Sequence, residues 1–272
     1  MLGCHGNTVA APPFRPLHRR VVVVDAGHGG IDAGSQIAGG VAEKTINLQL
    51  ALQLRDALQR MGATVILTRE SDVALSRENR VYRGRHREDL TCRVQIINSL
   101  QPDVWISLHC NSAPGDTRAR GAIVYYHRRN PANATLARAV QNRLNSLDLQ
   151  PFAAKPVRHK PVAANYFLLR NSQSVGVLVE AGYLSNATDL RLLQDAAWQR
   201  AFAENLALGI WDYLRVGPEG PAEYLHRDTG ELSTKGTQTL RRGQGITPKA
   251  PCDRPLVQSK RNGTGCKVRA DV

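Results

Sequence analysis

The sequence predicts a single α/β domain, with a twisted, mostly parallel sheet flanked by helices on both faces. Between residues 21 and 215, short runs of β-branched and aliphatic residues alternate with longer stretches of helical periodicity. This alternation is typical of parallel sheets whose strands are joined through helices. Of the 272 residues, 42% are hydrophobic and 22% are charged. That composition suits a buried core and excludes collagen, coiled coils and wholesale disorder.

The predicted strands begin with the valine run at 21–24, which is typical of a strand buried on both faces. Similar apolar runs predict strands at 63–68, 103–108, 121–127 and 175–179. Side chains alternate between the faces of a strand. Along 103–109 this alternation separates Val104, Ile106 and Leu108 from Trp105, Ser107 and His109, and it places His109 at the rim of the sheet.

Helical periodicity appears between these runs. Residues 43–61 place Leu50, Leu54, Ala57, Leu58 and Met61 on one face, and Gly62 follows as a C-terminal cap. A second helix is predicted over 131–147, opening with a proline at a favourable position. A third is predicted over 196–214, where Trp198, Phe202, Leu206 and Tyr213 align.

Composition divides the chain into three parts. We expect a flexible N-terminal segment at 1–20, one folded domain at 21–215 and a disordered basic tail at 216–272 that is rich in Gly, Pro, Thr, Lys and Arg. The net charge of +13 favours an anionic partner. Aromatic residues make up only 5% and fall mostly at predicted core positions, so we expect no nucleic-acid partner. No apolar run approaches the ~20 residues of a membrane span.

Residues able to bind metal or move protons follow three of the predicted strands. His28 lies in a glycine-rich turn after the first, His109 ends the central one, and Glu180 ends the last. Glu43 opens the first long helix. Because parallel sheets gather their ligand sites at the carboxyl ends of the strands, we expect these side chains to converge.

Two histidines and one carboxylate, with one open position, form a catalytic zinc set. His28, Glu43 and His109 are therefore the candidate zinc ligands, and Glu180 is the candidate proton-transfer group. Other interpretations stay open at this point: a histidine in a loop, a glutamate at a helix start that interacts with the helix dipole, or a phosphate-binding loop at 25–30. The last lacks the lysine of a P-loop and its full glycine spacing.

Several segments, taken in chain order, resemble the zinc-dependent N-acetylmuramoyl-L-alanine amidases of bacterial cell walls. The resemblance covers about residues 20–215. The segments are Val23-Val24-Asp25-Ala-Gly-His28-Gly-Gly, Glu43-Lys-Thr-Ile-Asn-Leu, Leu67-Thr-Arg69-Glu-Ser-Asp72, Arg93-Val-Gln-Ile-Ile-Asn98, Ile106-Ser-Leu-His109-Cys-Asn111-Ser and Val177-Leu-Val-Glu180-Ala-Gly-Tyr-Leu-Ser-Asn186.

This resemblance implies an enzyme that hydrolyses the amide between the lactyl group of N-acetylmuramic acid and L-alanine of the peptidoglycan stem peptide. It implies Zn²⁺ held by His28, Glu43 and His109, with Glu180 as general base and then general acid. Asn111 and Arg170 are weaker candidates for substrate binding.

An arginine-rich stretch at 75–90 resembles the germination-specific branch of the family, which prepares spore cortex for muramic δ-lactam formation. The resemblance implies peptidoglycan as partner, leaves open a protein activator, and implies an extracytoplasmic place in the cell wall or spore envelope, although no signal peptide is visible. The alternatives are a vegetative cell-wall amidase and a non-catalytic peptidoglycan-binding module.

Overall fold

The computed structural model describes residues 16–36, 40–76 and 86–216. The predicted tail from 217 onward, residues 1–15 and the middle of the arginine-rich stretch lie outside these ranges. Within them, Leu17 is fully buried and its amide donates to the Met61 carbonyl. Ordered packing thus already includes residues before 20, and the boundaries of the domain stay predictions.

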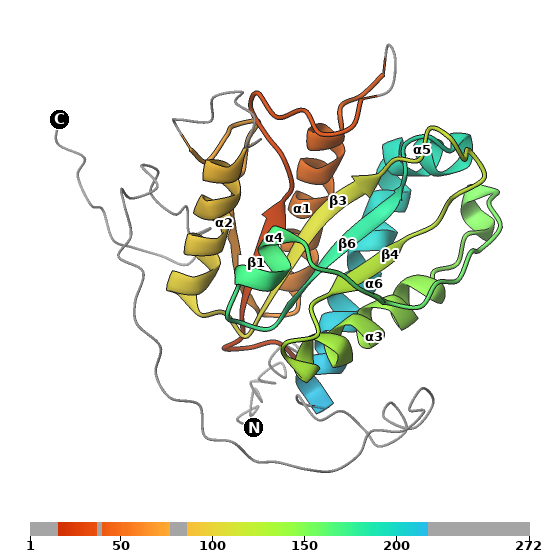
Figure 1. Ribbon diagram of the computed structural model, residues 1–272. Helices are drawn as coiled ribbons and strands as arrows, with labels where there is room; N and C mark the ends of the chain where they lie inside the picture. The colour runs from red at the N-terminus through yellow and green to blue at the C-terminus, as the bar shows by residue number, and fades with distance from the viewer. Residues whose placement is uncertain (1–15, 37–39, 77–85, 217–272) are drawn as a thin grey trace, which may run out of the picture.

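A mostly parallel sheet forms the middle layer, as predicted, and it has six strands (Figure 1). Its strands lie in the order β2-β1-β3-β6-β4-β5, and β2, β1, β3 and β6 are parallel, whereas β4 runs antiparallel to β6. The bounds are β1 Val21–Ala26, β2 Thr64–Leu67, β3 Val104–Asn111, β4 Ile123–Tyr126, β5 Val162–Ala163 and β6 Gly176–Tyr183.

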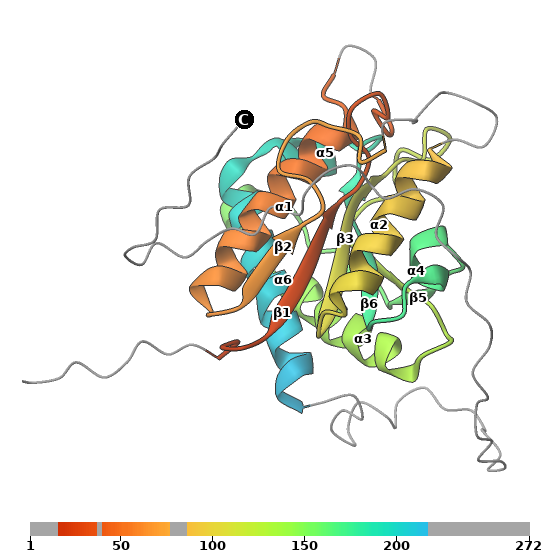
Figure 2. The ribbon, with the colours of Figure 1, turned by 90° about the vertical axis from the view of Figure 1, so that its left-hand side faces the viewer.

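Helices cover both faces of the sheet, which confirms the predicted fold class (Figure 2). They are α1 Glu43–Arg60, α2 Arg87–Leu100, α3 Pro131–Asn145, the 3₁₀ helix Gln150–Phe152, α4 Phe167–Asn171, α5 Ala187–Gln194 and α6 Ala196–Val216. Side chains of α1, α3, α5 and α6 pack in one core cluster with one face of the strands, and side chains of α2 and α4 pack with the other face.

Two of the predicted helices begin or end at or next to the glycine and proline that the sequence analysis identified as boundary residues. The apolar stripe of α1 is buried, and Gly62 follows it at φ +94°, a backbone conformation that favours glycine. Pro131 opens α3, and the Asn130 side chain accepts from the Ala132 amide as its N-terminal cap. The two-residue β5 and the short helices α4 and α5 were not predicted, because segments this short carry little periodicity. Helix α2 was expected only from the resemblance of residues 93–98 to the family.

The strand order reverses beside β1. Helix α1 leads from β1 to β2 on one side, and α2 then leads to β3 on the other side of β1, across the opposite face of the sheet. A crevice opens at the carboxyl ends of strands where the order reverses in this way. The residues that follow β1 and end β3 therefore meet there.

Candidate metal centre

The three predicted metal ligands lie together in this crevice. The glycine-rich turn after β1 carries His28, His109 lies near the end of β3, and Glu43 begins α1. One ligand atom from each residue lies within 4.8 Å of the others. The same Glu43 oxygen, Oε1, is 3.1 Å from His28 Nε2 and 3.1 Å from His109 Nδ1. The donor set of two imidazole nitrogens and one carboxylate thus faces a common point.

The turn that presents His28 depends on unusual backbone conformations. His28 has φ +62°, and Gly29 and Gly30 also have positive φ. The amide of Gly29 donates to the Asp32 carbonyl and that of Gly30 to Asp72 Oδ1. These N–H groups are used inside the protein, which argues against the phosphate-binding interpretation of this loop.

Gly27 leaves room for the imidazole of His109. A Cβ at position 27 would lie 2.3 Å from His109 Cε1 and 2.4 Å from Nε2. We expect Gly27→Ala to turn the His109 ring away from Glu43 and to weaken zinc binding about 10- to 100-fold, as changes beside metal ligands do. Competition with a zinc-binding dye measures this. Gly115→Ala, where the added Cβ meets nothing within 4 Å, should bind zinc like the wild type, and equal affinity in both variants would contradict the account.

Buried partners orient each ligand. His28 Nδ1 lies 2.8 Å from Asp32 Oδ2. Burial alone would lower the pKa of His28, but the carboxylates of Asp32 and Glu43 raise it to about 9. Since a metal requires the neutral imidazole, metal binding at neutral pH would release a proton.

Glu43 is 3% exposed and stays ionised. Burial works against its charge, but the two histidines hold its pKa far below the ordinary value of 4.5. Backbone and side-chain donors from Ser35, Asn47 and Cys110 complete its hydrogen bonds at 2.8 to 3.2 Å. The carboxylate is therefore fixed before any ion arrives.

Two arginines hold the main chain of the ligand turn. Arg93 donates to the carbonyls of Ala26 and His28, and Arg69 donates to those of Ala26 and Gly27. Arg93 is also paired with the buried Asp25, whose oxygens accept from Thr68 and Ser107 at 2.7 and 2.6 Å. This buried network joins β1, β3 and α2 beneath the turn.

Asp25 makes the stability of the metal-free protein depend on acid pH. Burial raises its pKa, but Arg93, Ser107 and Thr68 outweigh burial and hold the pKa below 3.8. Its stabilisation is complete above that value and is lost as the pH falls through the lowered pKa of the folded state. We expect Asp25→Asn to cost about 3 kcal/mol near pH 7, and the difference from the wild type to shrink as the pH falls below 3.8.

Urea unfolding of both proteins with a chelator present checks this. Glu204→Gln, which breaks the exposed pair with Arg60, should cost less than about 0.5 kcal/mol. An Asp25→Asn cost as small as this control would contradict a stabilising role for the buried pair.

Glu180 lies beside the three candidate ligands and is not part of their cluster. It pairs with His109 in the ladder of β3 and β6. Its Oε2 is buried and has no hydrogen-bond partner among the described residues. Burial raises the pKa of Glu180 to about 7. A carboxyl with this pKa, facing a cluster of metal ligands, can accept and return a proton near neutral pH.

These residues share a pocket of about 770 Å³. Tyr166, Phe167 and Leu168 form an apolar wall on the α4 side. Asn111 also lines the pocket, after a register shift that places it opposite Tyr183. Arg170 does not line it: this exposed residue of α4 lies over the Phe167 ring, 5.4 Å from the centroid. The structure thus brings together the predicted site residues except Arg170.

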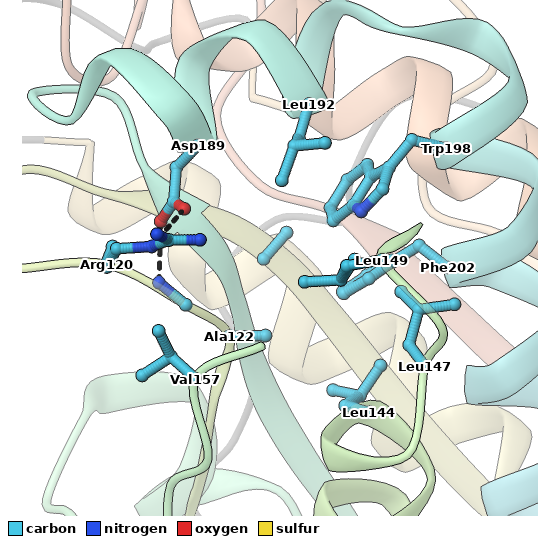
Figure 3. A pocket seen from close by; sticks show the side chains of 12 residues that line it. Arg120, Ala122, Leu144, Leu147, Leu149, Val157, Asp189, Leu192, Trp198 and Phe202 are labelled. Atoms are coloured by element: carbon cyan, nitrogen blue, oxygen red, sulfur yellow. Dashed lines mark hydrogen bonds and ion pairs between the residues drawn. The ribbon is translucent and has the colours of Figure 1, made fainter. Parts of the chain in front are cut away.

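A second, smaller pocket lies on the face of the sheet that α3, α5 and α6 cover (Figure 3). Its volume is about 40 Å³, and most of its lining is apolar, from residues such as Leu144, Trp198 and Phe202. At one end Asp189 accepts from the amides of Gly121 and Tyr183, at 2.6 and 2.9 Å. It offers no group of metal ligands, and we interpret it as a packing void.

Sequence reasoning missed the residues that position the ligands. Asp32 and Asn47 each lie four positions after a predicted ligand, His28 and Glu43, and that spacing was an available signal. Arg69 and Arg93 fell in segments that resembled the family, but their contacts with the ligand turn depend on the fold. Nothing in the sequence indicated that Tyr166 would line the pocket.

Comparisons with known proteins agree with this geometry. A family model described as Amidase_3, N-acetylmuramoyl-L-alanine amidase, matches residues 22–212. The chain is 35% identical over 207 residues to the germination-specific N-acetylmuramoyl-L-alanine amidase of Bacillus subtilis, covering 76% of this chain and 84% of that protein. It is 30% identical to the probable cell wall amidase LytH of Staphylococcus aureus, covering 73% of this chain and 60% of LytH.

Among solved structures, the chain resembles the CwlD amidase from Clostridioides difficile in complex with the GerS lipoprotein. The TM-score is 0.66 at 31% identity, covering 73% of this chain and 100% of CwlD. It also resembles the catalytic domain of CwlV from Bacillus (Paenibacillus) polymyxa, with a TM-score of 0.59 at 32% identity, covering 73% and 99% of the two chains.

Within the described ranges, no helix is long and apolar enough to cross a membrane.

Proposed function

Because this chain belongs to the Amidase_3 family of N-acetylmuramoyl-L-alanine amidases, we propose that it hydrolyses the amide between the lactyl group of N-acetylmuramic acid and L-alanine of the stem peptide, using zinc. The observation that carries the proposal is the convergence of His28, Glu43 and His109 beside the unpartnered carboxyl of Glu180. The catalytic domain would be residues 21–215.

The donor set suits zinc. Two imidazole nitrogens and one carboxylate oxygen leave a position open for a reactant, and Asp32 fixes the far nitrogen of His28, as partners of metal-bound histidines do. When bound, zinc supplies a Lewis acid that polarises the amide carbonyl and makes water more acidic.

The protein itself would move the proton. Glu180 accepts a proton from the attacking water at its unpartnered Oε2, and then donates it to the nitrogen of the departing alanine. A pKa near 7 supports both roles, since neither form of the carboxyl is costly at neutral pH. Asn111 would contact substrate inside the pocket. Arg170 would meet only those parts of the polymer that lie outside it.

A defined substrate tests the proposed reaction. We expect the wild type to convert N-acetylmuramoyl-L-alanyl-D-isoglutamine to N-acetylmuramic acid and a free dipeptide, identified by mass. A folded, zinc-containing protein that binds this compound without cleaving it would favour the non-catalytic peptidoglycan-binding module instead.

For the biological role we propose spore cortex maturation, in which removal of stem peptides precedes muramic δ-lactam formation. The support is the 35% identity to a germination-specific amidase, against 30% to LytH. The enzyme would then act outside the cytoplasm, in the spore envelope, and the complex of CwlD with a lipoprotein supports a protein partner.

Expression in a spore-former that lacks its own germination-specific amidase tests this role. Restored muramic δ-lactam in the purified cortex is the expected result. If the enzyme were active on isolated peptidoglycan but restored no lactam, a vegetative role would be favoured.

A further inference from the structure

A row of polar side chains continues across the sheet beyond Glu180. Neighbouring strands run in the order β1, β3, β6, β4, so the metal ligands that follow β1 and end β3 come first and Glu180 on β6 comes next. Tyr125 on β4 pairs with Leu178, two residues before Glu180 on the same face of β6. Tyr166, directly before α4, packs edge-on against Tyr125, with ring centroids 5.3 Å apart.

Asn111 lies close to this row and lines the same pocket as Tyr166. Its Oδ1 accepts from the amide of Ser112 at 2.9 Å. Burial raises the pKa of Tyr125 to about 12, and the neighbouring Asn111 side chain acts in the opposite direction. Burial likewise raises the pKa of Tyr166, against the effect of the neighbouring Tyr125 side chain.

Tyr166 stands where this row meets the pocket. Tyr166 lines the same pocket as Glu180 and is 43% exposed. Apart from Tyr125, no residue in the described part of the protein interacts with the Tyr166 hydroxyl as an acceptor. The ring of Tyr166 is held by its edge-on packing against Tyr125, and its hydroxyl can donate to a molecule in the pocket.

The proposed reaction fixes which part of the substrate lies there. The amide carbonyl must face the metal ligands of β1 and β3, and the amide nitrogen must face Glu180 on β6. The bond from carbon to nitrogen thus points toward β4, and the alanine that follows the nitrogen continues in that direction. Its own carbonyl then comes within reach of the residues beyond Glu180.

We propose that Tyr166 binds the stem peptide by donating a hydrogen bond to the carbonyl oxygen of its L-alanine, with Tyr125 and Asn111 as positioning residues. This inference rests on the proposed amidase function. It assigns the peptide side of the substrate to the β4 and α4 side of the pocket, and the muramoyl side to the turn that carries His28. The enzyme would thereby favour muramoyl peptides over simpler muramoyl amides.

Two substrates, one with the proposed acceptor and one without it, test this. One is N-acetylmuramoyl-L-alanyl-D-isoglutamine, and the other is N-acetylmuramoyl ethylamide, which has the same scissile bond but no alanine carbonyl. We expect Tyr166→Phe to lower kcat/KM about 5- to 10-fold on the peptide and to leave kcat/KM on the ethylamide unchanged. Tyr125→Phe should act in the same direction, with a smaller loss on the peptide alone.

Tyr126→Phe is the matched control, because Tyr126 follows Tyr125 on β4 but packs with the core on the opposite face. It should change neither rate. Equal losses on both substrates, or no loss on either, in Tyr166→Phe would overturn the role of Tyr166 while leaving the amidase function intact. A zinc-loaded wild type that cleaves neither substrate would instead overturn the proposed function, and this inference with it.

Discussion

Glu180→Gln should bind zinc as tightly as the wild type and yet cleave muramoyl peptides at least about 100-fold more slowly, since general acid–base groups contribute about 100- to 10,000-fold. Glutamine has nearly the same size and shape as glutamate but cannot take a proton from water or return one to the alanine nitrogen. Glu180 stands outside the cluster formed by His28, Glu43 and His109, so the zinc content should not change.

The same variant separates a catalytic role from a structural one. Burial raises the pKa of Glu180 to about 7, so holding it ionised in the metal-free protein costs folding free energy at about pH 8. Glutamine lacks this cost, and the metal-free variant should melt no lower than the wild type at that pH. Loss of activity together with a lower melting temperature would indicate a structural role, and wild-type turnover would remove Glu180 from the mechanism.

His109→Ala should lose both bound zinc and turnover. His109 Nδ1 faces the Glu43 oxygen that also faces His28, so its loss leaves two protein ligands where a catalytic zinc site uses three. Metal analysis after gel filtration should find zinc in the wild type and essentially none in the variant. Added zinc should not restore cleavage of a muramoyl peptide.

His86→Ala is the matched control for metal binding. His86 lines the same pocket, but its Nε2 lies 3.6 Å from Asp32 Oδ1 and it is not one of the three clustered ligands. This variant should keep its zinc. A His109→Ala protein with full zinc content, or a zinc-free protein that still releases peptide at the wild-type rate, would contradict the proposed centre.

The order of elements could be predicted because the sheet is mostly parallel and is buried on both faces. Strands such as β1 then appear as unbroken apolar runs, and the helices between them bury regular stripes such as that of α1. The direction of β4 was not predictable from its own residues. It runs antiparallel to β6, which it reaches by a connection through α3, β5 and α4 that leaves little pattern in the sequence.

The metal ligands could be predicted as a group because the carboxyl ends of parallel strands meet at one edge. Their partners could not, since their roles depend on contacts made only in the folded chain. Arg93 reaches the carbonyl of His28 from α2, 65 positions away in the sequence, and Tyr166 approaches Tyr125 of β4 from the start of α4. In the sequence these residues resemble ordinary surface or core positions.

Digestion of purified peptidoglycan, followed by mass analysis of the soluble products, tests whether this chain is a zinc-dependent amidase. We expect free stem peptides that begin with L-alanine, intact glycan strands, loss of this release on chelation and its return when zinc is added. Fragments cut within the glycan strands or at the peptide cross-links, or release that persists in the chelated protein, would contradict this function.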